Sequence, residues 1–168
     1  MPWDLREVGT DFLDVAPYRC TSTEILHRPA TPIFRALAED PAGWGAWNPG
    51  FSYQGRYLTS PPHGPGSVRE VIMAGIRYTD TILLWDEPYR WTFFVSRAGA
   101  PFAGALAEDY RITPQGEGGS HCTVQWTIAM DPHPLLAKTR PLMDALLPRY
   151  FRRAMTNLSA RLGASLSV

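Results

Sequence analysis

The 168-residue sequence lacks several features that would point to particular classes of protein. Sixteen Lys plus Arg balance sixteen Asp plus Glu, so the chain lacks the excess of base that a general nucleic-acid binder needs. No apolar run approaches the ~20 residues of a membrane span. The first residues, MPWDLREVGTDF, lack the apolar core of a secretory signal. We therefore expect a single-domain cytoplasmic protein, without nucleic acid or integral membrane association.

Cysteines and catalytic motifs are equally scarce. Cys20 and Cys122 are the only cysteines, too few for a disulfide framework or a zinc site, so both are expected to be reduced thiols. The sequence contains no phosphate-binding Gly-rich loop, no GxSxG elbow and no HExxH motif. His121 and Cys122 are neighbours on a predicted strand, so their side chains face opposite ways and cannot form a nucleophile–base pair. No metal site and no cofactor are implied.

Aromatic residues, by contrast, are abundant: six Trp, seven Tyr and seven Phe. Two interpretations stay open at this point. The aromatic side chains either fill a well-packed core, or they line a cavity for an apolar ligand.

Hydrophobic patterning divides the chain into an N-terminal arm (1–16), one domain (17–163) and a C-terminal tail (164–168). The domain opens with a β-rich segment at 18–28. A short helix follows, with Thr31 as its N-cap and Pro32 at the first helical position. The next segment is irregular, with at most one helical turn, and carries Trp44 and Trp47. Six short segments with turn signals between them then predict strands at 51–57, 67–75, 76–86, 89–97, 105–113 and 121–130.

The last forty residues predict helix again, with segments at about 135–147 and 148–163. Leu147, Phe151, Met155 and Leu158 lie on one apolar stripe. Pro148 is expected to break or kink the helix near Leu147. A seven-stranded antiparallel sheet wrapped around one long helix is the architecture that this order predicts, and a cavity between them is the expected consequence.

This order resembles the helix-grip fold of the START-like superfamily, which includes polyketide cyclases and dehydrases, the birch-pollen allergens and lipid-transfer domains. The resemblance rests on the helix and tryptophan-bearing turn in ATPIFRALAEDPAGWGAWNP, on the Gly-Gly turn into the last strand in GEGGSHCTVQWTIAMDP, and on the Arg-rich terminal helix. It implies an α+β fold that binds a hydrophobic ligand. Because the first and last strands are neighbours in that fold, it also implies that Cys20 and Cys122 lie near each other.

Strand alternation predicts which polar groups face the cavity. Leu106, Glu108, Tyr110 and Ile112 share one apolar face of their strand, and Cys122, Val124, Trp126, Ile128 and Met130 share another. An inward Glu108 would be desolvated and suited to acid–base work, although a strand-end Glu can instead reach solvent or pair with an Arg. The candidate catalytic residues are Glu108, Tyr110, Asp80 and Tyr78.

Candidate ligand-binding residues are chosen from the same alternation and from the resemblance. The family's cyclases often carry an arginine in the cavity, and Arg77 is the nearest candidate, although its parity conflicts with a cavity face that contains Tyr78. The predicted ligand contacts are Trp47, Phe51, Tyr53, Arg77, Trp91, Phe93, Trp126, Phe151 and Met155.

Three functions remain open from the sequence. The first is a carrier or binding module for a lipid- or polyketide-like molecule, and the second is a polyketide cyclase or dehydrase acting in the same cavity, where shape and proximity do much of the catalysis. The third is a regulatory or interaction protein using its basic C-terminal helix.

The C-terminal helix is locally basic: between 138 and 161 there are six basic residues and one acid. These form either a solvated face or a surface for an acidic carrier protein or an anionic membrane. A monomer and a homodimer are both compatible with the sequence.

Overall fold

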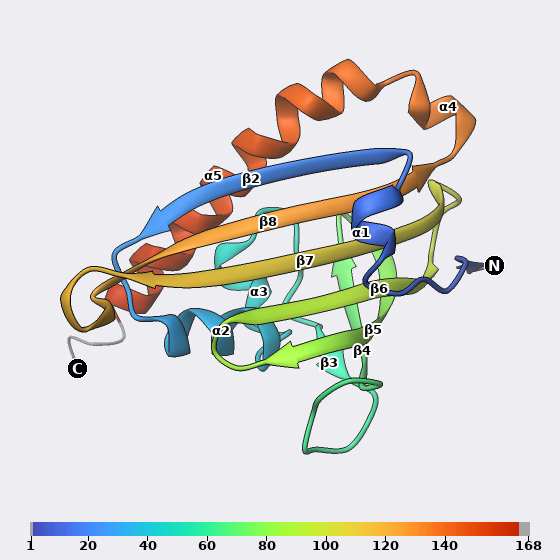
Figure 1. The fold of residues 1–168 in the computed structure, drawn as a ribbon. Helices are drawn as coiled ribbons and strands as arrows, with labels where there is room; N and C mark the ends of the chain where they lie inside the picture. The colour runs from blue at the N-terminus through green and yellow to red at the C-terminus, as the bar shows by residue number, and fades with distance from the viewer. Residues whose placement is uncertain (1, 165–168) are drawn as a thin grey trace.

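The computed structural model describes residues 2–164, and one antiparallel sheet forms its frame (Figure 1). The strands follow the order β2-β8-β7-β6-β5-β4-β3, and the short β1 pairs with β6. Their bounds are β1 (Trp3–Asp4), β2 (Tyr18–Leu26), β3 (Arg56–Tyr57), β4 (Val68–Met73), β5 (Ile76–Asp86), β6 (Arg90–Ala98), β7 (Ala103–Gln115) and β8 (His121–Pro132). The predicted α+β fold with seven antiparallel strands is confirmed, and the N-terminal arm adds β1 to it.

The longest helix of the described part, α5 (Arg140–Ala164), covers one face of this sheet, and the short α1 (Phe12–Val15) lies on the other face. The other helices are α2 (Ala30–Ala38), α3 (Trp44–Trp47) and α4 (Pro134–Ala137), with a 3-10 turn at Glu117–Gly119. The sheet curves around the second half of α5, with α2 and α3 closing one end (Figure 1). Apart from Ala164, the predicted C-terminal tail lies outside the described residues.

Alternation along the strands separates an inner face from an outer face, as the apolar pattern predicts. The inner face packs against α5 and holds the main core. Its buried members on β7 and β8 are Leu106, Tyr110, Ile112, Cys122, Val124, Trp126 and Met130. A register shift between Ile82 and Leu84 on β5 changes the alternation there, so that Trp85, rather than Leu84, packs against Phe34 of α2 at 5.5 Å between ring centroids.

The N-terminal arm covers part of the outer face. Val8, Phe12 and Leu13 pack against Phe94 and three small side chains, Ala105, Ala107 and Ala129. Figure 1 shows α1 lying across β7 and β8 on the side away from α5. The apolar side chains of the arm are therefore used for packing, except at Val15, which is 73% exposed.

Helix α5 runs without interruption through Pro148, so the helix does not break near Leu147, and of the two expected outcomes only a kink stays a prediction. Proline removes one backbone donor from the helix, but the following turn is held in place by two contacts. Phe151 is buried against the sheet, and the Tyr150 hydroxyl donates to the side chain of Asn48 at 2.5 Å. No helix between residues 2 and 164 combines the length and the apolar character needed to cross a membrane.

Two local predictions before the sheet need correction. Helix α2 begins at Ala30 after Pro29, so Thr31 lies inside the helix and is not its N-cap. The predicted strand at 51–57 pairs with β4 only at Arg56 and Tyr57, with one isolated bridge from Phe51 to Met73. The backbone turns between these points. Gly55 then lies against the Pro41 carbonyl, so close that a Cβ atom there would be 2.2 Å from the oxygen.

Both cysteines are free thiols. Strands β2 and β8 are neighbours, as the resemblance implies, but their register pairs Cys20 with Ile128 and Cys122 with Leu26. Six positions of an extended strand, about 20 Å, therefore separate the two thiols. The expectation that Cys20 and Cys122 lie near each other is wrong.

Candidate functional site

Two adjoining pockets, which we treat as the two lobes of one cavity because they share lining residues, lie between α5 and the inner face of the sheet. The lobe that contains Arg69 has a volume of about 200 Å³, and the lobe that contains Trp126 has a volume of about 290 Å³. We call these the Arg69 lobe and the Trp126 lobe. Six residues line both: Trp44, Phe51, Met73, Glu108, Ile128 and Leu147. Most of these side chains are apolar, so the few polar groups determine how a ligand would be oriented.

A buried ion pair supplies the polar end of the Arg69 lobe. Arg69 and Asp80 are each 1% exposed, and Arg69 Nε donates to Asp80 Oδ2 at 2.8 Å. Register explains the pairing, because Arg69 on β4 lies directly opposite Asp80 on β5. Burial raises the pKa of the Asp80 carboxyl, and the charge and hydrogen bond of Arg69 oppose that rise.

Aromatic rings enclose the guanidinium of Arg69. Its Cζ atom lies 4.5 Å from the Trp44 ring, 4.4 Å from Trp91 and 4.6 Å from Phe93, so the cation is held by ring faces as well as by Asp80. Within residues 2–164, its Nη1 finds no hydrogen-bond partner. A buried donor without a partner is costly, and a ligand oxygen that accepts from it would recover that cost.

Glu108 occupies the junction of the two lobes. Trp126 Nε1 donates to its Oε2 at 2.8 Å and the Tyr110 hydroxyl donates to the same oxygen at 3.2 Å. Desolvation raises the pKa of Glu108 to about 7, against the opposing hydrogen bond from Trp126, and the negative charge of Asp80 adds to the rise. Glu108 therefore changes protonation state near neutral pH, as a general acid–base group must.

Seven of the sequence-predicted residues line this cavity. The Arg69 lobe is lined by Tyr78, Asp80 and Phe93, and the Trp126 lobe is lined by Tyr110 and Trp126. Phe51 and Glu108 line both lobes. Burial raises the pKa of Tyr78, and the negative charge of Glu108 adds to that rise. Burial also raises the pKa of Tyr110, so Tyr78 and Tyr110 are both neutral hydroxyls. The Tyr78 hydroxyl can donate to a ligand, whereas the Tyr110 hydroxyl already donates its hydrogen to Glu108 and can accept.

Four predicted ligand contacts lie in the core behind the lining. Trp47, Trp91, Phe151 and Met155 are buried and are not among the lining residues. Trp47 packs on Trp44 with 5.1 Å between ring centroids, and Phe151 stacks on Trp126 at 5.3 Å. These side chains support the lining from behind. Alternation and helix spacing identify buried faces, but they do not separate the layer that touches a cavity from the layer behind it.

Tyr53 and Arg77 lie outside the cavity, contrary to the prediction. Tyr53 is 70% exposed because the chain turns between Phe51 and Arg56 instead of extending as a strand. Arg77 lies on the outer face of β5, where it pairs with Glu70. Its strand parity had indicated this outward direction.

The cavity arginine is Arg69, which the prediction missed. The available signal was parity on β4, because Arg69, Val71 and Met73 alternate onto one face and the last two are apolar. Apolar neighbours at positions 71 and 73 place Arg69 inside and Glu70 outside, where Glu70 meets Arg56 and Arg77.

The raised pKa of Glu108 leads to a prediction about stability. Between its ordinary value of 4.5 and its folded value of about 7, the folded protein holds a proton that the unfolded chain has released. The free energy of unfolding should therefore fall as the pH rises through this window, and the loss should be complete above it. Denaturant unfolding at about pH 5 and pH 8 measures the change, and Glu108→Gln should remove this contribution. An equal pH dependence in both proteins would show that Glu108 is not desolvated.

Comparison with known proteins agrees with this geometry. A family model described as polyketide cyclase / dehydrase and lipid transport matches residues 19–163. Uncharacterized proteins of Mycobacterium bovis and Mycobacterium tuberculosis are 30% identical over 163 residues, which cover 94% of this chain and 95% of each relative.

Two solved structures share the fold at low sequence identity. A START superfamily protein of Mycobacterium smegmatis matches with a TM-score of 0.70 at 14% identity, over 87% of this chain and 97% of that one. An aromatase/cyclase from a Streptomyces species matches with a TM-score of 0.70 at 14% identity, over 90% of this chain and 96% of that one.

Proposed function

Since the chain belongs to the polyketide cyclase, dehydrase and lipid transport family, we propose that it binds an apolar, aromatic or polyketide-like small molecule in the cavity under α5. The observation that carries this proposal is the two-lobed apolar cavity with one buried arginine at one end. An elongated ligand would fill both lobes, with an oxygen atom accepting from Arg69 and its apolar body against Trp126.

Arg69 favours a ligand with a carbonyl, enolate or carboxylate oxygen. Its charge is already matched by Asp80, so a neutral carbonyl oxygen meets the donor without adding a second charge to the site. A developing enolate would gain more from the same contact. In this proposal Asp80 is a positioning residue, since its carboxylate holds the guanidinium of Arg69 from the neighbouring strand β5.

Binding is tested with N-phenylnaphthylamine, an uncharged aromatic fluorophore. We expect saturable binding with a dissociation constant of roughly micromolar order, and Trp126→Ala should weaken it by roughly tenfold because the variant loses one aromatic wall of the lobe. Trp3→Ala is the matched control, because Trp3 is 54% exposed on β1 and lies outside both lobes. A folded wild-type protein that shows no saturable signal would exclude the cavity function.

A second candidate function is catalysis of the cyclase or dehydrase type. The observation that favours it is Glu108, a carboxyl group at the junction of the lobes whose pKa is raised to about 7. Its carboxylate would remove a proton from carbon next to a carbonyl group, and the electron pair would pass to the carbonyl oxygen as an enolate facing Arg69. The enolate carbon would then attack a second carbonyl carbon of the same ligand, whose C=O π bond breaks to leave an alkoxide. The protonated Glu108 would return its proton to that alkoxide. Tyr78 and Tyr110 would orient the chain through their hydroxyls.

A further inference from the structure

Helix α5 carries an exposed stripe on the side that faces away from the sheet. It consists of Leu142, Leu146, Arg149 and Arg153, and we call it the α5 stripe. Steps of four, three and four residues place these side chains within an arc of about 60°. Leu142 and Leu146 are 57% and 50% exposed, whereas the opposite side of the helix is buried at Phe151. Two large apolar side chains thus stand in solvent beside two cations.

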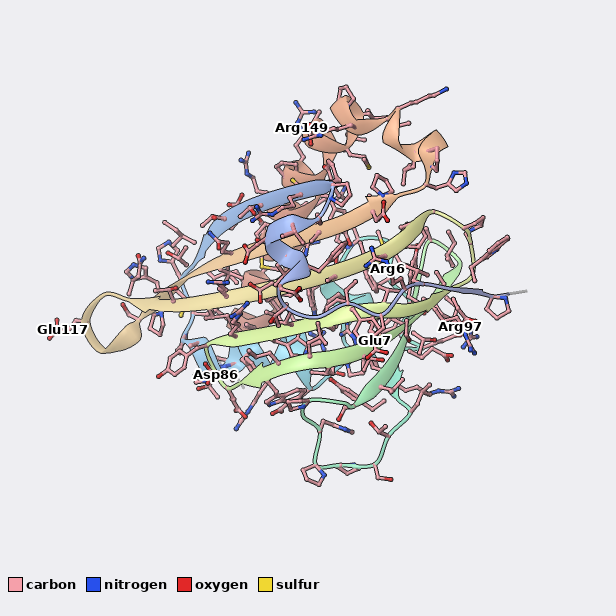
Figure 2. The ribbon with its side chains drawn as sticks, turned by 45° about the vertical axis from the view of Figure 1, so that its right-hand side comes forward. Arg6, Glu7, Asp86, Arg97, Glu117 and Arg149 are labelled. Atoms are coloured by element: carbon pink, nitrogen blue, oxygen red, sulfur yellow. The ribbon has the colours of Figure 1, made fainter. Side chains whose placement is uncertain are left out.

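The two arginines of the stripe are unpaired. Two other basic residues of α5 have acidic partners: Arg140 reaches Asp144 at 3.9 Å, and Arg152 reaches Glu24 at 3.0 Å. In the part of the chain that the structure describes, no ion pair involves Arg149 or Arg153. Figure 2 shows Arg149 on α5, at the outer edge of the molecule. The stripe therefore presents positive charge that the protein itself does not neutralise.

The same turns of α5 form the roof of the cavity. Met143 and Leu147 line the Arg69 lobe from above, and Leu146 lines the Trp126 lobe while half of its surface remains exposed. In Figure 1 the first half of α5 rises beyond β2, away from the rest of the sheet. Apolar surface thus continues from the inside of the cavity to the outside of the helix.

We propose that the α5 stripe docks the protein onto an anionic lipid bilayer, with the helix lying in the plane of the interface. The leucines would enter the boundary between headgroups and acyl chains, and the arginines would contact lipid phosphates over the stripe's length of about 16 Å. Charge alone would also suit an acidic protein. The two exposed leucines next to the cavity roof favour the bilayer, because they match an apolar phase that can exchange molecules with the cavity.

This proposal goes beyond the cavity function, because it names where the ligand would be collected or delivered. The test is flotation of the full chain with vesicles of phosphatidylcholine, alone or mixed with phosphatidylglycerol. We expect binding only to the mixed vesicles, and weaker binding at high salt. Arg149→Gln with Arg153→Gln should weaken binding by roughly thirtyfold, from the loss of two cationic contacts.

Matched variants separate the stripe from net charge. Arg77→Gln with Arg97→Gln removes the same charge from exposed positions on β5 and β6 and should leave vesicle binding nearly unchanged. Leu142→Gln should reduce binding several-fold at constant charge, and it leaves the cavity lining intact.

Three results would overturn the proposal. They are a wild type that binds no vesicle, a double arginine variant that binds as well as the wild type, and stripe-dependent binding of an acidic acyl carrier protein without vesicle binding. The affinity for N-phenylnaphthylamine in lipid-free buffer is measured for every variant. Unchanged affinity there, together with lost vesicle binding, separates a failure of docking from a failure of the cavity.

Discussion

Replacing Asp80 with valine is expected to lower the free energy of unfolding by about 3–5 kcal/mol. The reason is that Asp80→Val leaves its partner, Arg69, without a counter-charge. Arg69 is 1% exposed and enclosed by three aromatic rings, so its charge would stay buried without a counter-charge. Denaturant unfolding followed by tryptophan fluorescence measures the loss as a lower midpoint.

A double-mutant cycle tests whether the loss comes from the pair. Arg69→Met combined with Asp80→Val removes both charges at similar volume, so it should recover most of the stability that Asp80→Val alone loses. The control is the exposed Arg97–Asp4 pair, which has the same nitrogen–oxygen distance of 2.8 Å. Asp4→Ala should cost no more than about 1 kcal/mol, because solvent screens that pair. If Asp80→Val lowers the free energy of unfolding by no more than Asp4→Ala does, burial does not set the strength of the Arg69–Asp80 interaction.

The fold could be predicted from the sequence because its sheet has one clearly apolar face. On β7 and β8 the alternation places Tyr110 and Trp126 inside, and both are buried. The errors occur where distant contacts override a local rule. Pro148 stays inside α5 because the turn that follows it is held by packing, and the register of β2 on β8, which local patterns do not encode, separates Cys20 from Cys122.

The cavity was predicted less well than the fold, and the arginines show why. The family resemblance suggests Arg77, whereas the parity of β4 with Val71 and Met73 indicates Arg69. The ion pair to Asp80 needs the cross-strand register of β4 and β5, which no pattern within a single strand contains. Glu108 was identified correctly as an inward group because its own strand supplied enough apolar neighbours.

Glu108→Gln is expected to lower turnover of a short poly-β-keto thioester by roughly 10²–10⁴, if the cavity is catalytic. The amide oxygen can still accept from Trp126 and Tyr110, as the carboxylate does, so the thermal midpoint and the affinity for N-phenylnaphthylamine should remain close to those of the wild type. Only the titrating proton is removed. Product formation is followed by absorbance or mass, and the wild-type rate should change with pH near 7, where Glu108 titrates.

Glu70→Gln is the matched control, because Glu70 has the same side chain on the opposite face of the sheet, with Arg56 and Arg77 as its partners. It should leave turnover unchanged. If Glu108→Gln also leaves turnover unchanged, Glu108 orients the ligand and does not transfer protons, since a group that moves a proton in the slow step cannot be replaced by an amide. If the wild-type protein binds the thioester without converting it, the carrier function is favoured. The cavity then supplies only its shape and the contact with Arg69, and Glu108 transfers no proton.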